Sequence, residues 1–264
     1  MAERLALFRQ SPNRVVDWGA FLGAGGPLLI AAYPQAKLIA VESSSDLAAR
    51  SRQVLKSPWW TGRRWTAPPV EVLVDDSDSH LAEVQLVWAN MALHAVKDPP
   101  ALMERWYRML SSGGFVMFSC LGPDTMRELR ALYARLRWPV PTVDFVDMHD
   151  LGDMLLHAGF ADPVMDQETL TVQWDSPQSL IDDLRMLGGN VSPARAGGLR
   201  TPRWRACLNR ELDTLRNASG KLSLTFEVIY GQAFKAASKV EPPSETHVPL
   251  EEMRRLMREA RRPT

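Results

Sequence analysis

The sequence predicts an α/β fold built on a doubly wound, mostly parallel β-sheet. Short apolar runs alternate with helix-period segments from the N-terminus onward, which is typical of βαβ units. The first run, VVDW at 15–18, leads into a glycine-rich turn, and four more strand and helix steps follow it. Because successive βα units add parallel strands to one sheet, this order favours helices on both faces of that sheet.

Five apolar runs in the first half are predicted strands, each short and bounded by turn residues. Two longer segments in the second half alternate in polarity like strands. The seven predicted strands are residues 14–18, 37–42, 70–74, 84–88, 114–120, 163–174 and 221–234.

Helices are predicted between these strands from their start and stop signals. Pro99 and Pro100 open a helix that ends before Gly113, and the segments at 122–136 and 149–160 have helical periodicity. Two further helices begin at 176 and 201, because Ser176 and Thr201 are good N-caps that are each followed by a proline.

The chain therefore divides into a domain at 1–234, which includes a mainly helical segment at about 122–220, and a linker with a basic tail at 235–264. The tail places Leu250, Met253 and Met257 at helical spacing, so it could dock on a partner. A frayed tail is favoured instead, because isolated helices this short are barely stable in water.

Composition excludes several classes of function. Lys plus Arg (31) balance Asp plus Glu (31), so no global field favours nucleic acid or an anionic membrane. Only two cysteines occur, and no residue spacing resembles a metal site. No window is apolar enough for a membrane span, and the N-terminus lacks the apolar core of a signal peptide, so we expect a cytoplasmic protein.

The glycine-rich turn points to a ligand with an adenosine group. In a doubly wound sheet, the turn after the first strand lies beside the end of the second strand. Gly19 and Gly23 flank that turn, and Glu42 ends the second strand, where a carboxylate can accept hydrogen bonds from both ribose hydroxyls. A tight turn in an α/β domain without such a ligand is the alternative.

Residues 15–23, followed by Glu42 and by 86–129, resemble the class I S-adenosylmethionine-dependent methyltransferases. The closer resemblance is to the malonyl-acyl-carrier-protein O-methyltransferases of biotin synthesis. It is found in GPDTMRELR, MHDLGDMLLHAGFADPVMDQETLTV, LIDDLRMLGGN and LTFEVIYGQAF. It implies a Rossmann-like, seven-stranded sheet, with the helical segment at 122–220 on the substrate side. It also implies S-adenosylmethionine as the cofactor, contacted by Asp17, Gly19, Gly23, Glu42, Asp75, Asp76 and Asn90. Asp75 and Asp76 could instead merely end the third strand.

The same resemblance implies that the methyl acceptor is the free carboxylate of a malonyl group on acyl carrier protein, or of a free malonyl thioester. Arg185 is the candidate for binding that carboxylate, with Asn190 as a neutral donor and His149 as an orienting partner. Each has an alternative role: a surface ion pair for Arg185, a helix stop for Asn190 and a helix cap for His149.

The sequence departs from the family pattern at two places. Phe21 stands where the family's turn has a glycine, so its ring is expected to occupy space used by the methionine part of the cofactor. Only 14 residues precede Val15, so the helix that covers the cofactor is expected to be truncated or missing. A methyltransferase-fold binding or regulatory module is therefore the alternative to an enzyme. A nicotinamide-dependent oxidoreductase is disfavoured, because the turn lacks G-x-G-x-x-G.

The segment SPWWTGRRWTAPP at 57–69 has a composition unlike its neighbours. Tryptophan and arginine interleaved on a loop could bind an acidic carrier protein or a nucleic acid. A packed loop that covers the edge of the sheet is the favoured alternative.

Overall fold

The computed structural model describes residues 1–7, 11–55, 70–75 and 81–236. The segment 57–69, Asp76 and the tail beyond 236, for which the sequence suggested roles, lie outside the described residues. Within the described part, no helix is long and apolar enough to cross a membrane.

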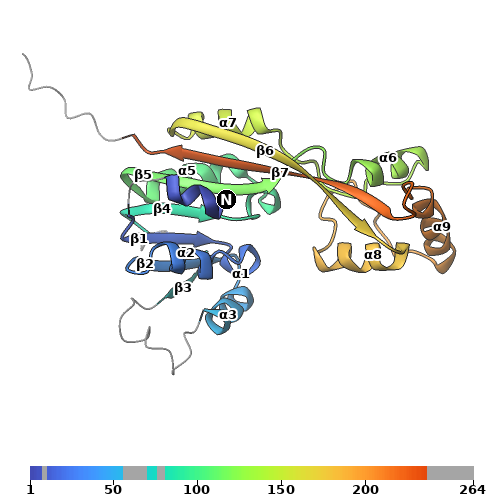
Figure 1. Cartoon of the computed structure of the whole chain (residues 1–264), viewed down its shortest axis with the longest axis horizontal. Helices are drawn as coiled ribbons and strands as arrows, with labels where there is room; N and C mark the ends of the chain where they lie inside the picture. The colour runs from blue at the N-terminus through green and yellow to red at the C-terminus, as the bar shows by residue number, and fades with distance from the viewer. Residues whose placement is uncertain (8–10, 56–69, 76–80, 237–264) are drawn as a thin grey trace, which may run out of the picture.

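Seven strands form one sheet in the order β3-β2-β1-β4-β5-β7-β6 (Figure 1). The strands β1 to β5 are parallel, whereas β7 is antiparallel to β5 and β6 is antiparallel to β7. The strand bounds are β1 Arg14–Trp18, β2 Lys37–Glu42, β3 Glu71–Val74, β4 Val84–Ala89, β5 Leu110–Leu121, β6 Ala161–Trp174 and β7 Leu222–Phe234. The predicted fold class and all seven predicted strands are confirmed.

The helices begin where the sequence places good N-caps. Asp98, Ser176 and Thr201 each accept a hydrogen bond from a backbone N–H of the following turn, and proline follows each of them. The helix bounds are η1 Ala2–Leu7, α1 Ala20–Gly23, α2 Gly26–Ala32, α3 Ser45–Val54, η3 Leu93–Ala95, α5 Pro99–Met109, α6 Arg127–Arg135, α7 Met148–His157, α8 Pro177–Met186 and α9 Pro202–Asp213.

Both faces of the parallel part of the sheet are covered. One face packs on α5 and α7, where Trp106 and Leu155 are fully buried against Val16 and Phe118. The other face packs on α2 and η1, where Leu29 and Leu5 meet residues of β1, β2, β4 and β5. Burial on both faces explains why these strands read as continuous apolar runs.

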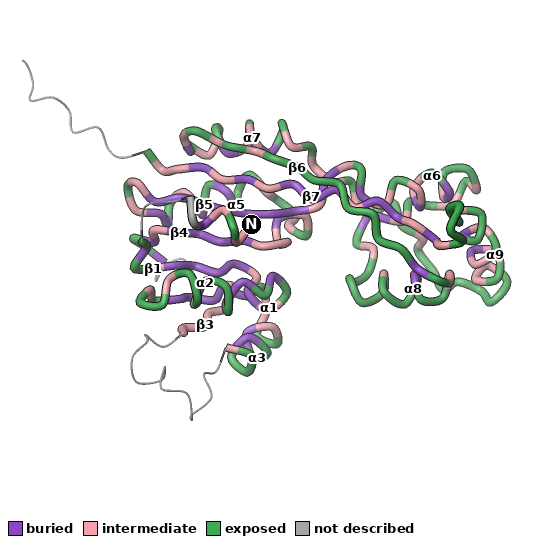
Figure 2. The backbone as a smooth tube through the Cα atoms, viewed as in Figure 1, coloured by how far each residue is buried: buried purple, intermediate pink, exposed green. Residues whose placement is uncertain are grey.

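The strands β6 and β7 extend beyond the rest of the sheet and build a second core. Only residues 228–234 of β7 pair with β5, whereas β7 pairs with β6 over its whole length. The free ends of this ribbon pack against α6, α8 and α9 around Leu180, Leu212 and Leu224 (Figures 1 and 2). We call this part the second lobe: residues 122–140 and 169–227.

The second lobe does not contain the whole helical segment predicted at 122–220. Helix α7 lies within that range, but Leu151 and Leu155 bury it against the sheet and α5. The segment therefore leaves the sheet, returns to it through α7, and leaves it again along β6.

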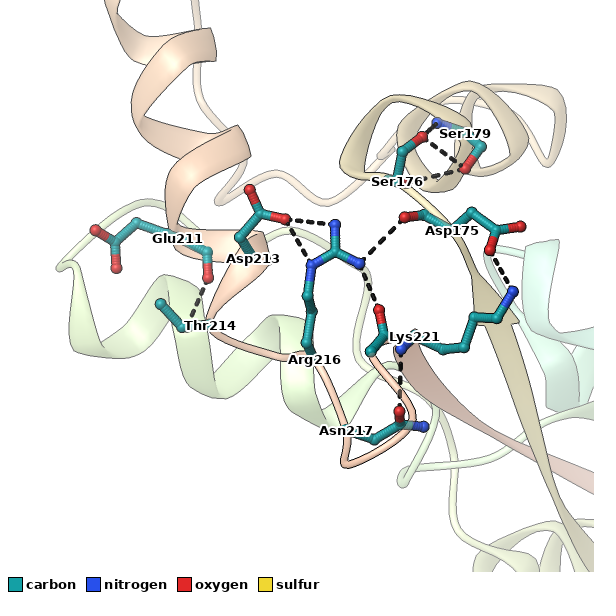
Figure 3. A network of polar contacts seen from close by, with 10 residues as sticks. Asp175, Ser176, Ser179, Glu211, Asp213, Thr214, Arg216, Asn217 and Lys221 are labelled. Carbon is teal, nitrogen blue, oxygen red and sulfur yellow. Dashed lines mark hydrogen bonds and ion pairs between the residues drawn. The ribbon is translucent and has the colours of Figure 1, made fainter.

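A polar network lies at the end of the second lobe, where β6 ends and β7 begins (Figure 3). The guanidinium of Arg216 donates to the carboxylate of Asp213 and to the carbonyl oxygens of Asp175 and Gly220. Lys221 pairs with the Asp175 carboxylate. These bonds tie the end of α9 to the turn that leads from β6 into α8.

The contact between β5 and β7 allows a direct test of this packing. Gly231 lies opposite Phe118, and a Cβ on Gly231 would come within 2.3 Å of the buried Phe118 ring. We expect Gly231→Ala to lower the free energy of unfolding by about 1–3 kcal/mol, because the ring has no room to move. Urea unfolding measures the change.

The matched control is Gly197→Ala, because nothing lies within 4 Å of a Cβ at Gly197. We expect that change to stay within about 0.5 kcal/mol. Equal effects of the two substitutions would contradict the packing described for Phe118.

Candidate active site

The turn after β1 is built from glycines that other groups approach closely. Gly19 has a φ of +70° and donates its N–H to the Val41 carbonyl at the end of β2. A Cβ on Gly23 would lie 2.7 Å from the Asn90 carbonyl oxygen, and one on Gly25 would lie 2.5 Å from the Trp88 indole nitrogen. Glycine is therefore required here for close backbone approach.

Asp17 lies beneath this turn with no accessible surface. It is the register partner of Trp88 on β4, and a Cβ on Gly25 would lie 3.0 Å from its Oδ1. Neither carboxylate oxygen of Asp17 has a hydrogen-bond partner among the described residues, nor has the Trp88 indole N–H. Burial, with the charge of Glu42, raises the pKa of Asp17 to about 7.

Glu42 is the second buried carboxylate of the site. It ends β2, as predicted, and its Oε1 accepts from the Phe21 backbone N–H at 2.7 Å and from the Ser51 hydroxyl. No ion pair joins Asp17 or Glu42 to a cationic side chain in the described residues. Two buried carboxylates without a cation make this end of the sheet suited to a positively charged ligand.

Asn90 holds the turn in place from the end of β4. Its side-chain N–H donates to the Gly23 carbonyl at 2.7 Å, and its Oδ1 accepts from the Ser119 hydroxyl at 2.7 Å. Ser119 in turn accepts from the N–H of Met91, which has a φ of +52°. The Asn90 amide thus joins the turn after β1 to β5, and both of its polar atoms make contacts within the protein.

The ring of Phe21 is directed toward α3. The Arg50 guanidinium lies over it, 5.7 Å from the ring centroid. The atoms nearest to the glycines that follow belong to Asn90, Trp88, Asp17 and Leu55. The Phe21 ring is thus not among the nearest neighbours of these glycines, and its overlap with the space used by the methionine part of the cofactor stays a prediction.

Asp75 and Gln85 each connect neighbouring segments of the sheet. Asp75, one residue after β3, donates its N–H to the Glu42 carbonyl, and its carboxylate pairs with Arg105 of α5. Arg105 also lies over the Trp18 ring. At the opposite end of the sheet, the Gln85 side chain accepts from the backbone N–H groups of Asn13 and Arg14.

Known proteins are similar to this chain in sequence. A profile of the methyltransferase domain family matches residues 1–162. A malonyl-[acyl-carrier protein] O-methyltransferase from Gallionella capsiferriformans is 36% identical over 243 residues, which span 91% of this chain and 83% of that protein. This chain belongs to the methyltransferase family. The predicted resemblance and the prediction of an enzyme are confirmed.

Solved structures show that the fold of the methyltransferase is shared as well. The YcgJ protein from Bacillus subtilis has a TM-score of 0.58 at 15% identity, over 89% of this chain and 99% of that chain. Phosphoethanolamine N-methyltransferase 2 from Haemonchus contortus, in complex with S-adenosyl-L-methionine, has a TM-score of 0.53 at 13% identity. That alignment covers 89% of this chain and 51% of that chain.

The three predicted acceptor residues of the methyltransferase lie apart from the glycine turn. His149 is exposed in the first turn of α7, where Asp147, not His149, is the N-cap. Arg185 is exposed on α8, with Nη1 3.6 Å from Asp182 Oδ1. Asn190 donates to the Val140 carbonyl at 2.8 Å. No hydrogen bond or ion pair links these three to the turn in the described part of the chain.

His94 is a candidate residue that the sequence did not reveal. It lies in η3, directly after the β4 loop that contains Asn90, and its ring faces Phe145 at 6.5 Å. Its Nδ1 is buried without a partner among the described residues, and burial lowers its pKa. A lone histidine in the run MALHAV gave no signal, because its position depends on the 145 loop folding over it.

The raised pKa of Asp17 makes stability depend on pH. The folded state keeps the Asp17 proton up to about pH 7, whereas the unfolded chain releases it near the ordinary pKa of 3.8. The free energy of unfolding therefore falls as the pH rises toward 7. Between about pH 5 and pH 8, Asp17 should lower the free energy of unfolding of the wild type by roughly 2–3 kcal/mol. We expect this decrease to be absent from Asp17→Asn. Urea unfolding at both pH values measures this.

Asp153→Asn is the matched control, since that side chain is exposed on α7. Its pH dependence should follow the wild type. The burial argument for Asp17 fails if Asp17→Asn also follows the wild type.

Proposed function

We propose that this methyltransferase binds S-adenosylmethionine at the glycine turn and transfers its methyl group to the carboxylate of a malonyl thioester on acyl carrier protein, in biotin synthesis. The unpartnered carboxylate of Asp17 beneath the turn is the observation that supports cofactor binding most directly. The acceptor is proposed from the names of relatives such as the Gallionella protein.

The residues of the site fit this cofactor. It has positive charge on its sulfonium and ammonium groups, and the site offers Asp17 and Glu42, neither of which pairs with a cation among the residues that the structure describes. Gly23 and Gly25 let the backbone approach closely, and Gly19, Glu42 and Asn90 hold the shape of the turn. Asp75, paired with Arg105, borders the end of β3, and Asp76 remains a proposed contact.

When bound, S-adenosylmethionine supplies a methyl group that an anionic oxygen can accept by in-line displacement. The acceptor carboxylate is already a nucleophile, so the protein needs to align it and exclude water, and no general base is required. Arg185 is proposed to bind the second carboxylate oxygen, since its guanidinium is exposed and its contact with Asp182 is long. His149 and Asn190 remain proposed orienting groups.

His94 is proposed to help orient the acceptor. Burial lowers its pKa, which favours the neutral imidazole, a form that can donate one hydrogen bond. A neutral donor orients a carboxylate without the strong pairing that would reduce its nucleophilicity.

Cofactor binding tests the role of Asp17. We expect Asp17→Asn to weaken S-adenosylmethionine binding by roughly 10- to 100-fold, because a charge-assisted contact is lost. Wild-type affinity should rise as pH increases through 7, where Asp17 ionises, and that rise should be absent from the variant. Calorimetric titration at several pH values, with Asp153→Asn as control, measures both effects. An affinity unchanged by Asp17→Asn would remove Asp17 from the cofactor site.

Methyl transfer tests the acceptor. We expect the wild type to form a methyl ester on malonyl carrier protein, detected by intact-protein mass spectrometry. Arg185→Ala should lower kcat/KM by roughly 100-fold or more, since the ion pair to the second carboxylate oxygen of the acceptor is lost, while S-adenosylhomocysteine affinity stays the same.

Arg108→Ala, an exposed arginine on α5, is the control and should keep the wild-type rate. An Arg185→Ala rate equal to that of the control would exclude Arg185 as the acceptor group. No ester from the wild type would contradict the proposed substrate.

A further inference from the structure

All the charged side chains in a long stretch of the second lobe are positive. Residues 184–210 contain six arginines and no lysine, histidine, aspartate or glutamate, although the whole chain has equal numbers of basic and acidic residues. The six are Arg185, Arg195, Arg200, Arg203, Arg205 and Arg210. Such a local excess is not the usual solvated surface, in which both signs are mixed.

The arginines near the middle of this stretch are not neutralised by the protein. Arg195, Arg200 and Arg203 are exposed, and none of them has an ion pair to a described acidic residue. Arg195 donates to the Ser192 carbonyl, and Arg200 lies over the Trp204 ring at 4.6 Å. Their charges therefore face solvent.

Large apolar side chains are exposed beside these arginines. Met186, Leu187, Val191 and Leu199 have exposed fractions of 86%, 69%, 70% and 102%. Exposed apolar residues grouped in one segment and bordered by charge are typical of protein interaction sites. Figure 2 colours much of the backbone tube near α8 and α9 green, the colour of exposed residues.

The segment has a defined backbone. Asn190 donates to the Val140 carbonyl and accepts from the Ser192 N–H at 2.9 Å, and the Ser192 hydroxyl accepts from the Ala194 N–H. Thr201 then caps α9 through the Trp204 N–H. These bonds order the backbone on both sides of residues 196–200, which reduces the entropy cost of binding.

We propose that residues 191–203, with the exposed Met186 and Leu187 beside them, form the docking surface for the acyl carrier protein, an inference that rests on the proposed function. Acyl carrier proteins are small acidic proteins, so their charge is complementary to this surface. They present the acyl group on a flexible thioester arm, so the carrier can bind the second lobe while the acyl group reaches the carboxyl ends of the strands. Charge complementarity of this kind chiefly sets encounter rate and partner choice.

The test compares a carrier-bound substrate with a small one. The double variant Arg195→Glu, Arg203→Glu is assayed with malonyl carrier protein and with malonyl-coenzyme A. We expect KM for the carrier substrate to rise roughly 10-fold or more, with kcat unchanged, because only docking is weakened. Both constants for malonyl-coenzyme A should stay at their wild-type values. The control is Lys37→Glu, Arg108→Glu, which changes two exposed cations on the sheet domain.

Direct binding separates this inference from the proposed function. Fluorescence anisotropy of labelled malonyl carrier protein should show binding that weakens with salt in the wild type and is reduced roughly 10-fold in the double variant. If the wild type binds in this way but methylates neither thioester, the docking surface stands and the proposed function fails. If carrier binding is equal in the double variant and the control, the docking surface is excluded.

Two other occupants would also overturn the proposal. Light scattering that shows a wild-type dimer and a monomeric double variant would identify a second copy of this chain as the partner. Binding to vesicles of anionic phospholipid that the double variant loses, without any change in carrier binding, would identify a membrane surface instead.

Discussion

The rest of the site depends on a carboxylate that is buried without a partner. Asp17 is held on β1 beside Trp88, and the glycine turn closes over it. The fold keeps an ionisable group in a place where its charge costs free energy, which raises its pKa to about 7. Such an arrangement is costly for an empty protein and favourable when a cation completes it. The proposed cofactor contact and the pH dependence of stability therefore involve the same side chain.

The second lobe is a consequence of how the sheet ends. After five parallel strands, the chain adds β7 and β6 as an antiparallel pair that runs past its neighbours. The overhanging ribbon needs its own apolar cover, which α6, α8 and α9 supply around Leu180 and Leu224. The protein thus has two cores, one that supports the glycine turn and one that presents the arginine-rich surface.

The sequence predicted the strands and the capped helices well, because their signals are local. Ser176 and Thr201 mark helix starts wherever the helices lie, and Glu42 ends β2 as its spacing indicated. Contacts between distant segments could not be predicted. That the Phe21 ring meets Arg50, or that His94 lies under Phe145, depends on packing that no local pattern encodes. Arg185 is exposed on α8, a position that fits both an acceptor-binding group and a surface ion pair.

The paired ribbon that joins the two cores also limits how they can move. Both β6 and β7 are continuous from the sheet into the second lobe, and they pair without a break from Val164 opposite Gln232 to Trp174 opposite Leu222. A hinge formed by rotation about a few loop bonds is therefore ruled out along this connection. Any displacement of the lobe must twist two strands together, so motion of a docked partner would be transmitted to the edge of β5 and, through Ser119 and Asn90, to the glycine turn.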